Sequence, residues 1–276
     1  MIVRVPASTA NLGPGFDTLG MALSLHLEVG VEPLEDSFGP AESERHPAVV
    51  AFRRLGGTGS LFVRSPIPMG RGLGFSGAAR VAGLVAAVAQ RDGGFDLDEH
   101  CAEIMALATE LEGHADNAAA SLYGGVIATN GLHTVRVPMQ FDPAVVCWVP
   151  FNETSTNESR ARLPDTVAIE DVVFNLARTA MLVAAFASGD TDVLAEVTQD
   201  RLHQQLRFAQ SPESRVALDT MLALGAWCGW LSGSGPTVAA LCAAGEAEAV
   251  AAALPAANAA IKVLRIDHAG AVVEDS

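Results

Sequence analysis

The chain has 276 residues, half of them apolar, and a formal net charge of −15, which suits one large domain or two modest ones. Its acidic balance disfavours nucleic acid as a partner, because that binding depends on basic patches, and no apolar run is long enough to predict a membrane span. Four scattered cysteines without a C-x-x-C pair argue against a structural zinc site, and the N-terminal segment lacks a signal-peptide layout, so we expect a cytoplasmic protein.

In chain order, the first half alternates short strands, loops and helices. Glycine-punctuated or polar loops are expected at 11–20 and 33–47. Strands are predicted at Met1–Val5, Met21–Val31 and Ser60–Arg64, helices at Ala48–Leu55, from near Ser76 to Gln90 and at Asp98–Glu112, and a hairpin at Gly124–Thr129 and Thr134–Val137.

The second half is predicted to order its elements differently. A polar loop is expected at 152–166. Strands are predicted at Val145–Val149, Trp227–Leu231, Thr237–Cys242 and Ile261–Ile266, the last being the final strand, and helices at Glu170–Ala187, Thr191–Arg207, Pro212–Leu224 and Glu246–Leu254. We therefore predict an α+β protein of two units, 1–144 and 145–276, the second of which suits a split βαβ sandwich.

The most informative segment is PIPMGRGLGFSGAA, which begins at Pro66. Four glycines crowd its eight positions from Gly70 to Gly77, and a helix is expected to start near Ser76. Glycine lets the backbone turn freely and lets a ligand approach bare N–H groups. Because a helix N-terminus also attracts anions, the segment predicts a site for phosphate, on a nucleotide or a small metabolite.

Commoner phosphate loops do not fit this segment. A dinucleotide fingerprint needs a second strand ending in an acid about 20 residues later, but the helix expected through Gln90 leaves no room for a strand before Asp92. A P-loop needs a lysine where Ala78 stands, and the protein-kinase loop needs a downstream lysine, whereas Lys262 is the chain's one lysine. A tight turn packing a helix on a sheet remains the alternative.

Three other polar segments stand out. The residues of NLGPGFD (11–17) are typical of an ordinary turn. ELEGHADN (110–117) gathers acids, a histidine and an amide, which suits Mg²⁺ beside phosphate oxygens, or else a helix C-cap at Gly113. LSGSGPT (231–237) is compatible with an anion nest or with a plain hairpin turn.

Together these segments resemble the GHMP kinases over nearly the whole chain. VPASTANLGPGFDTLG, PIPMGRGLGFSGAA and LSGSGPT resemble three family motifs, while EGHADN, NETSTNESRARLP and DRLHQQLRF are similar to stretches of the homoserine kinase branch. The resemblance implies a two-domain fold: an N-terminal ATP-binding domain (1–144), ribosomal-protein-S5-like and α+β, and a C-terminal ferredoxin-like split βαβ domain (145–276). It also implies a homodimer.

The activity implied by the resemblance is MgATP-dependent phosphorylation of the homoserine side-chain hydroxyl, a step of threonine biosynthesis. Two other readings stay open: a GHMP kinase for another small amino alcohol or hydroxy metabolite, and a non-catalytic ligand-binding GHMP protein. Phe75 keeps the last one open, because it stands where the family usually has serine, and Gly77 stands where the family has alanine.

Site residues follow from the same resemblance. Ser76 and Glu112 are expected to hold Mg²⁺, and Asp116 with Asn11 to act in catalysis, Asp116 either orienting the hydroxyl or accepting its proton. The residues expected to bind the amino acid are Asn11, Asp17, His114, Asp116, Arg160 and Arg207. Those expected to bind ATP are Pro68, Gly70, Gly72, Leu73, Gly74, Phe75, Ser76, Gly77, Ser232, Gly233, Ser234 and Gly235. For the arginines, a solvated surface charge is the alternative.

Overall fold

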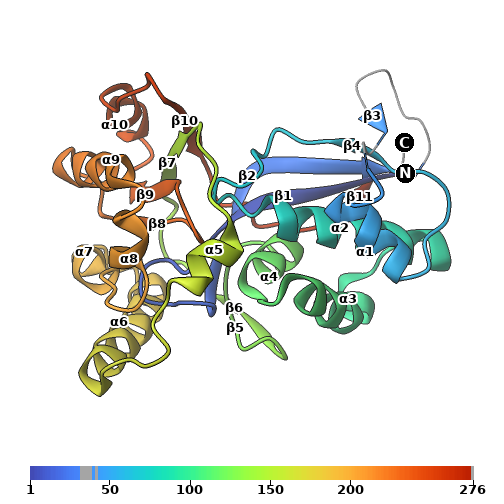
Figure 1. The fold of residues 1–276 in the computed structure, drawn as a ribbon, viewed down its shortest axis with the longest axis horizontal. Coiled ribbons are helices and arrows are strands. Elements are labelled where there is room, and N and C mark those ends of the chain that lie inside the picture. The colour runs from blue at the N-terminus through green and yellow to red at the C-terminus, as the bar shows by residue number, and fades with distance from the viewer. Residues whose placement is uncertain (32–38, 41–42, 275–276) are drawn as a thin grey trace.

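A computed structural model describes residues 1–31, 39–40 and 43–274, and within them the strands form two antiparallel sheets (Figure 1). The first sheet has the order β11-β1-β2-β4-β3, with β5 paired to β2 and β6 to β5. Its strands are β1 (Ile2–Ala10), β2 (Leu19–Gly30), β3 (Gly39–Pro40), β4 (Phe62–Arg64), β5 (Val126–Thr129), β6 (Thr134–Val137) and β11 (Val272–Glu274). Of the loop predicted at 33–47, residues 33–38 and 41–42 lie outside the described residues.

The second sheet has the order β10-β7-β9-β8. Its strands are β7 (Ala144–Pro150), β8 (Cys228–Leu231), β9 (Val238–Cys242) and β10 (Ala259–Leu264). In chain order this is fourth-first-third-second, the arrangement of a split βαβ sandwich, so the predicted α+β class is confirmed. Ile261–Ile266 is not the final strand, because β11 follows it and pairs with β1 of the first sheet. The division at 144/145 stays a prediction.

The helices gather in two groups (Figure 1). The first four lie beside the long strands β1 and β2, α7 to α10 lie around the second sheet, and α6 packs against α7 and β6. The helices are α1 (Pro47–Arg54), α2 (Phe75–Asp92), α3 (Leu97–Glu112), α4 (Asp116–Tyr123), α5 (Thr156–Ala161), α6 (Ile169–Ser188), α7 (Leu194–Val197), α8 (Gln204–Phe208), α9 (Pro212–Ala223) and α10 (Ala247–Ala252).

Hydrogen bonds from nearby side chains explain two of the three places where the observed helices differ from the predicted ones. The single helix predicted at Thr191–Arg207 is two short helices, because the Asp200 carboxylate accepts the N–H groups of His203 (2.9 Å) and Gln204 (2.7 Å) and starts α8 afresh. The loop predicted at 152–166 contains α5, capped by the Ser155 hydroxyl. The polar segment after the α3 C-cap opens α4 directly, with its acid in the first turn.

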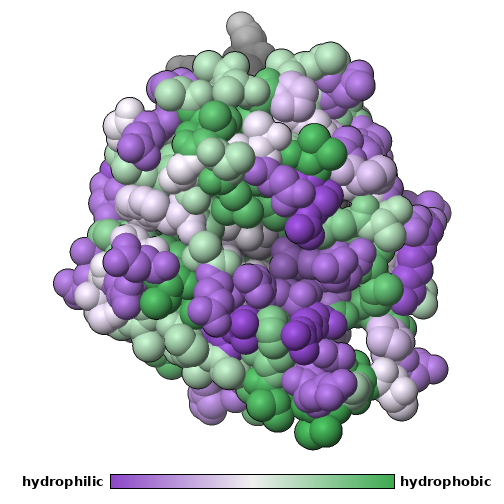
Figure 2. All heavy atoms as spheres, turned by 90° about the vertical axis from the view of Figure 1, so that its left-hand side faces the viewer, coloured by the Kyte–Doolittle hydropathy of each residue, from purple (hydrophilic) through white to green (hydrophobic). Residues whose placement is uncertain are grey.

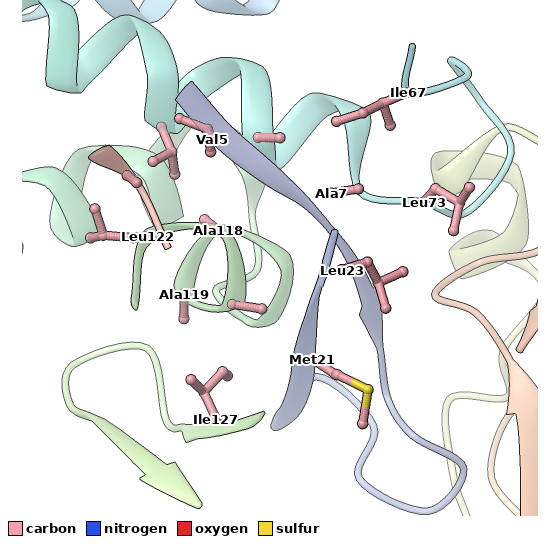
Figure 3. Close-up of a cluster of buried hydrophobic side chains, with 14 of the residues drawn as sticks. Val5, Ala7, Met21, Leu23, Ile67, Leu73, Ala118, Ala119, Leu122 and Ile127 are labelled. Atoms are coloured by element: carbon pink, nitrogen blue, oxygen red, sulfur yellow. The ribbon is translucent and has the colours of Figure 1, made fainter. Parts of the chain in front are cut away.

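Small residues let the helices of the first half approach closely. Every residue of helix α2 from Gly77 to Ala89 is buried except Arg80. A Cβ on Gly83 would lie 2.1 Å from the carbonyl oxygen of Ala48 in α1, so the two backbones touch. Figure 3 shows the same core nearby, where side chains of α4 meet those of both long strands: Val5, Ala7, Met21, Leu23, Ala118, Ala119 and Leu122. The alanine-rich composition therefore serves packing density.

Helix α6 carries an apolar face that the described residues leave exposed. Ile169, Val173 and Leu176 lie on this face at helical spacing, and all three are exposed. In Figure 2, apolar spheres gather at the lower edge of this side of the molecule, at the height of α6 in Figure 1. Across 1–31, 39–40 and 43–274, none of the helices combines the length and apolar character that a bilayer crossing requires.

Candidate active site

A cavity of about 300 Å³ lies where the glycine segment 70–77, the loop 11–18, the starts of α4 and α5 and the turn 232–235 meet. The cavity is within the size range of small-molecule sites. It brings together most of the site residues predicted from the sequence, namely Asn11, Asp17, Pro68, Gly70, Gly72, Gly74, Phe75, Ser76, Glu112, His114, Asp116, Arg160, Arg207, Gly233 and Ser234.

Four predicted residues do not line this cavity. The side chain of Leu73 is fully buried in the core (Figure 3), so it offers a ligand only its backbone. Gly77 faces α4, since a Cβ there would lie 3.1 Å from Asn117 Cβ. Ser232 is buried, and Gly235 lines a smaller neighbouring cavity.

The glycine segment is built for close approach. Gly70, Gly72 and Gly74 have φ values of 65°, 81° and 68°, in the left-handed region that favours glycine. Gly74 is the N-cap of α2 and provides no side-chain cap, so the first N–H groups of this long helix have no capping side chain where the helix meets the cavity. A Cβ on Gly74 would lie 2.0 Å from Ser8 Oγ. These features suit an anion at the helix N-terminus.

Phe75, the main departure from the family pattern, has an aromatic partner. Its ring meets that of His46 edge to face, with the ring centroids 5.8 Å apart. The side chain also packs against the core cluster. Its bulk is therefore supported by neighbouring groups at the rim of the cavity.

The turn 232–235 uses its polar groups internally. The N–H groups of Ser232, Gly233 and Gly235 donate to the carbonyls of Thr237, Ala10 and Ser232, at 2.9, 3.2 and 2.9 Å. The Ser232 hydroxyl donates to the Gly72 carbonyl at 2.5 Å. Because these groups already have partners, the turn ties β1, the glycine segment and the second sheet together and keeps few donors for an anion.

The loop 11–18 adopts an unusual backbone. Asn11, Leu12 and Asp17 have φ values of 70°, 47° and 55°, a region that non-glycine residues rarely occupy. Asn11 sits at its centre: the side-chain Nδ2 donates to the Gly233 carbonyl and Oδ1 accepts the Asp17 N–H, both at 3.0 Å. Such backbone conformations persist only where surrounding contacts enforce them, and they concentrate at functional sites.

Those surrounding contacts come from the second half of the chain. Asn175 Nδ2 and Thr179 Oγ1 of α6 both donate to the Pro14 carbonyl at 3.1 Å. His203 Nε2 lies 2.9 Å from the Gly13 carbonyl, and a Cβ on Gly13 would lie 2.1 Å from the Thr198 carbonyl oxygen. The loop is thus clamped by α6 and the α7–α8 region, which turn chemistry alone does not explain.

Two arginines face the cavity from α5 and α8. Arg160 binds the Asp17 carboxylate with two hydrogen bonds of 2.6 and 2.8 Å, and this carboxylate raises the pKa of Arg160. Arg207 is buried, and that burial, followed by repulsion from Arg160, lowers the pKa of Arg207 to about 10. Both guanidinium carbons lie near the Phe16 ring, 5.5 and 5.3 Å from its centroid. This pair of cations suits a carboxylate.

Arg207 is oriented by His203. The Arg207 NH1 group donates to the Gly233 carbonyl at 2.8 Å and to His203 Nδ1 at 3.0 Å. Because a guanidinium only donates, Nδ1 accepts and the proton of the ring sits on Nε2, facing Gly13. Burial lowers the pKa of His203, which favours this neutral form.

His114 and Asp116 form a second polar pair at the start of α4. Asp116 is only 2% exposed, and its Oδ1 accepts hydrogen bonds from His114 Nδ1 and from the Asn117 N–H, both at 2.8 Å. The positive end of the α4 dipole stabilises a carboxylate at this position. Since these bonds all use Oδ1, Oδ2 is the oxygen left for a ligand in the cavity.

Ser76 and Glu112 meet at the other side of the cavity. The Ser76 hydroxyl donates to Glu112 Oε2 at 3.0 Å, which joins the start of α2 to the end of α3. A hydroxyl and a carboxylate are the hard oxygen donors that Mg²⁺ takes beside phosphate oxygens. Among the described residues, no cluster of three or more His, Cys, Asp or Glu is arranged to hold a metal ion without other ligands.

Besides His203, sequence reasoning missed three contributors. Arg80 donates to Ser76 Oγ at 2.6 Å, and its spacing of four residues on a predicted helix was the signal that placed both on one face. Thr156 Oγ1 lies 3.2 Å from Ser234 Oγ at the cavity rim. Arg71 donates to the Phe151 carbonyl and ties the glycine segment to the second sheet. The latter two carry no sequence signal of their own.

Comparison with known proteins gives the class of this chain. The family model described as "GHMP kinases N terminal domain" matches residues 45–125, and "GHMP kinases C terminal" matches residues 182–260. The chain therefore belongs to the GHMP kinase family, and the predicted two-part fold is confirmed.

Its curated relatives narrow the class. The chain is 37% identical to the homoserine kinase of Moorella thermoacetica over 297 residues, which covers 99% of both chains. It is 40% identical to the homoserine kinase of Thermus thermophilus over 267 residues, covering 91% of this chain and 90% of that one. Among solved structures, homoserine kinase from Cytophaga hutchinsonii superposes with a TM-score of 0.83 at 25% identity, covering 98% of this chain and 96% of that one.

Proposed function

We propose that this protein is a kinase that transfers the γ-phosphoryl group of MgATP to the side-chain hydroxyl of L-homoserine, producing O-phospho-L-homoserine and ADP. One observation carries the proposal: a single cavity joins an anion cradle at a helix N-terminus to a polar end with two arginines and two carboxylates. The relatives named homoserine kinase, similar over almost the whole chain, support the same acceptor.

The nucleotide end is assigned to the glycine segment. The backbone N–H groups between Gly70 and Gly77 would wrap the phosphates, with the α2 dipole favouring their negative charge. Ser76 and Glu112 fit Mg²⁺ because they place one hydroxyl and one carboxylate together. Bound there, the metal would neutralise phosphate charge as the phosphoryl group moves. With one protein carboxylate available, the metal would arrive with the nucleotide.

The amino-acid end is assigned to the two arginines and Asp17. In the structure, Arg160 and Asp17 satisfy each other through their paired hydrogen bonds. A zwitterion offers each of them a replacement: its carboxylate pairs with Arg160 and Arg207, and its ammonium pairs with Asp17. An acceptor that lacks either charge would leave one member of this pair unpaired, which favours an α-amino acid over a neutral alcohol.

The hydroxyl is assigned to Asp116. His114 and the Asn117 N–H hold Oδ1, so Oδ2 would accept the hydrogen bond of the acceptor hydroxyl and direct its oxygen toward the γ-phosphate. Asn11 contributes by holding the backbone of Asp17 in its left-handed conformation. Catalysis would then rest mainly on positioning and charge neutralisation, as phosphoryl transfer generally does.

An acceptor panel tests the proposal. ADP release is measured with homoserine, threonine, serine and mevalonate at saturating MgATP. We expect the highest kcat/KM with homoserine, whose longer side chain would reach Asp116 while its charged end stays on the arginines. Nucleotide binding without turnover of any acceptor would refute the kinase, and preferred turnover of mevalonate would refute the zwitterion site.

We also propose that the protein is a homodimer joined through the exposed apolar face of α6. This face, 169–176, includes Leu176, which is 65% exposed, and adjacent exposed apolar side chains on one helix are typical of a surface that pairs with a second copy. Light scattering should show a dimer for the wild type and a monomer for Leu176→Asp. The control Leu132→Asp, at a hairpin tip where the leucine is 86% exposed, should remain dimeric. A dimeric Leu176→Asp variant would rule out this interface.

A further inference from the structure

Arg80 occupies the oxygens to which the metal is assigned. Helix α2 places it one turn after Ser76, and its NH1 group donates to Ser76 Oγ at 2.6 Å. The same NH1 group forms an ion pair with Glu112 Oε2. The two side chains are 20% and 8% exposed, so water screens this contact poorly.

Glu112 needs a cation in this position. It is the last residue of α3, where the helix dipole presents its negative end, and the last turn of α3 contains no basic residue. A nearly buried carboxylate at a helix C-terminus is unfavourable unless it is paired. Glu110, two residues earlier, pairs instead with Arg54 on the exposed side. Within the described part of the chain, the ion pair formed by Glu112 is the one with Arg80.

Arg80 itself is incompletely satisfied. A guanidinium has five N–H donors, yet in the described residues the hydrogen bond of Arg80 uses NH1, and its buried Nε has no partner. The guanidinium thus contacts Ser76 and Glu112 through NH1 alone. Moving it away from this pair would break few other hydrogen bonds.

We propose that Arg80 is a tethered counter-cation that Mg²⁺ displaces from Glu112 when the nucleotide binds. This inference rests on the proposed function, because it assumes nucleotide phosphates at the glycine segment. In the absence of metal, Arg80 neutralises Glu112, so incoming phosphates do not meet a bare carboxylate. Mg²⁺ would have to break the ion pair between Arg80 and Glu112 before it could bind Glu112. The cost of breaking that pair would reduce the amount by which the metal strengthens nucleotide binding.

Calorimetry of ADP binding measures this competition without turnover. The quantity is the ratio of ADP dissociation constants in EDTA and in saturating Mg²⁺, for wild type and Arg80→Met, which keeps the apolar stem. We expect the variant to raise the ratio about tenfold, equivalent to about 1.4 kcal/mol. Two effects add: metal-free binding weakens because Glu112 repels phosphates, and the metal no longer displaces a cation.

Matched variants isolate the cause. Arg91→Met removes an exposed arginine of the same helix that pairs with Asp92 and Glu103, and it should keep the wild-type ratio. Adding Glu112→Gln to Arg80→Met should abolish the increase, because no bare carboxylate remains. Arg80→Gln, whose amide can still donate to Glu112, should raise the ratio in the same direction and keeps the test decisive if Arg80→Met fails to fold.

The outcomes separate this inference from the proposed function. A ratio for Arg80→Met or Arg80→Gln within about twofold of wild type, or below it, would overturn the competition while nucleotide binding itself stands. Persistence of the increase in the double variant would also overturn it. Failure of wild type to bind ADP under either condition would refute the proposed nucleotide site and this inference with it.

Discussion

Two glycine- and serine-rich segments face each other in this molecule, and they use their backbones in opposite ways. The segment 70–77 opens a long helix whose N-cap, Gly74, provides no side-chain hydrogen bond. The turn 232–235 donates three of its N–H groups to carbonyls of the protein and uses the Ser232 hydroxyl to bind the Gly72 carbonyl. The segment 70–77 is thus available to an anion, and the turn 232–235 holds the segment 70–77 in place.

The difference shows that glycine content alone does not identify a phosphate site. What distinguishes the two is where their N–H groups find partners, and that depends on the next element: an 18-residue helix after the first segment, and strand β9 after the second. A helix start leaves N–H groups without intrahelical partners, whereas a strand connection pairs them. The following predictions test this division from the largest expected effect to the smallest.

Glu112→Gln removes the carboxylate beside the open segment. We expect kcat with MgATP to fall by about 100-fold or more, because charge neutralisation at the phosphates is the main catalytic contribution. Steady-state ADP release measures it, with Glu110→Gln as a control that alters an exposed carboxylate two residues away. Near-wild-type turnover in Glu112→Gln would move the metal role to another residue.

Gly72→Ala places a methyl group in the contact between the segment 70–77 and the turn 232–235. Gly72 has φ +81°, and a Cβ there would lie 2.4 Å from the Ser232 carbonyl oxygen. We expect the free energy of unfolding to fall by about 2–4 kcal/mol, measured by urea denaturation. Gly131→Ala, with φ +87° and open space around it, isolates the backbone penalty at about 1 kcal/mol. Equal losses in both variants would show that the two segments are not in essential contact.

Arg207→Ala tests the part of the cavity assigned to the amino acid. The turn 232–235 supports Arg207 there, because the Gly233 carbonyl accepts a hydrogen bond from it. Losing charge-assisted hydrogen bonds should raise the KM for homoserine about 10- to 100-fold, with the KM for ATP changed by less than about threefold. Arg162→Ala, an exposed arginine two residues after Arg160, is the control. An unchanged homoserine KM would refute the carboxylate clamp.

How much the sequence predicted depended on the range of the interactions. Local patterns predicted α2, α3 and α6 within two residues of their observed ends, because their apolar spacing and C-terminal glycines act locally. The helix predicted over 191–207 failed because capping by Asp200 overrode apolar periodicity there. Strand β11 was missed because three residues gain strand structure only by pairing with β1, some 270 positions away.

For the site, the resemblance of the motifs predicted which residues come together. It did not predict which hydrogen bonds and ion pairs these residues form with one another. Asp17 and Arg160 were both expected to bind the substrate, yet in the structure they also bind one another across 143 positions of sequence. His203 was not predicted to orient Arg207, since its partners Gly13 and Arg207 come together only in the folded chain. Pairing between remote side chains depends on the tertiary fold, which a single sequence does not specify locally.

The most direct test of the division between the two segments compares one serine from each. Calorimetry would measure ADP affinity in saturating Mg²⁺ for wild type, Ser76→Ala and Ser232→Ala. We predict about tenfold weaker binding for Ser76→Ala and less than about threefold for Ser232→Ala, whose loss should appear as about 1–2 kcal/mol of folding stability. Unchanged affinity in Ser76→Ala together with weakened affinity in a fully folded Ser232→Ala would contradict the assignment of the nucleotide phosphates to 70–77.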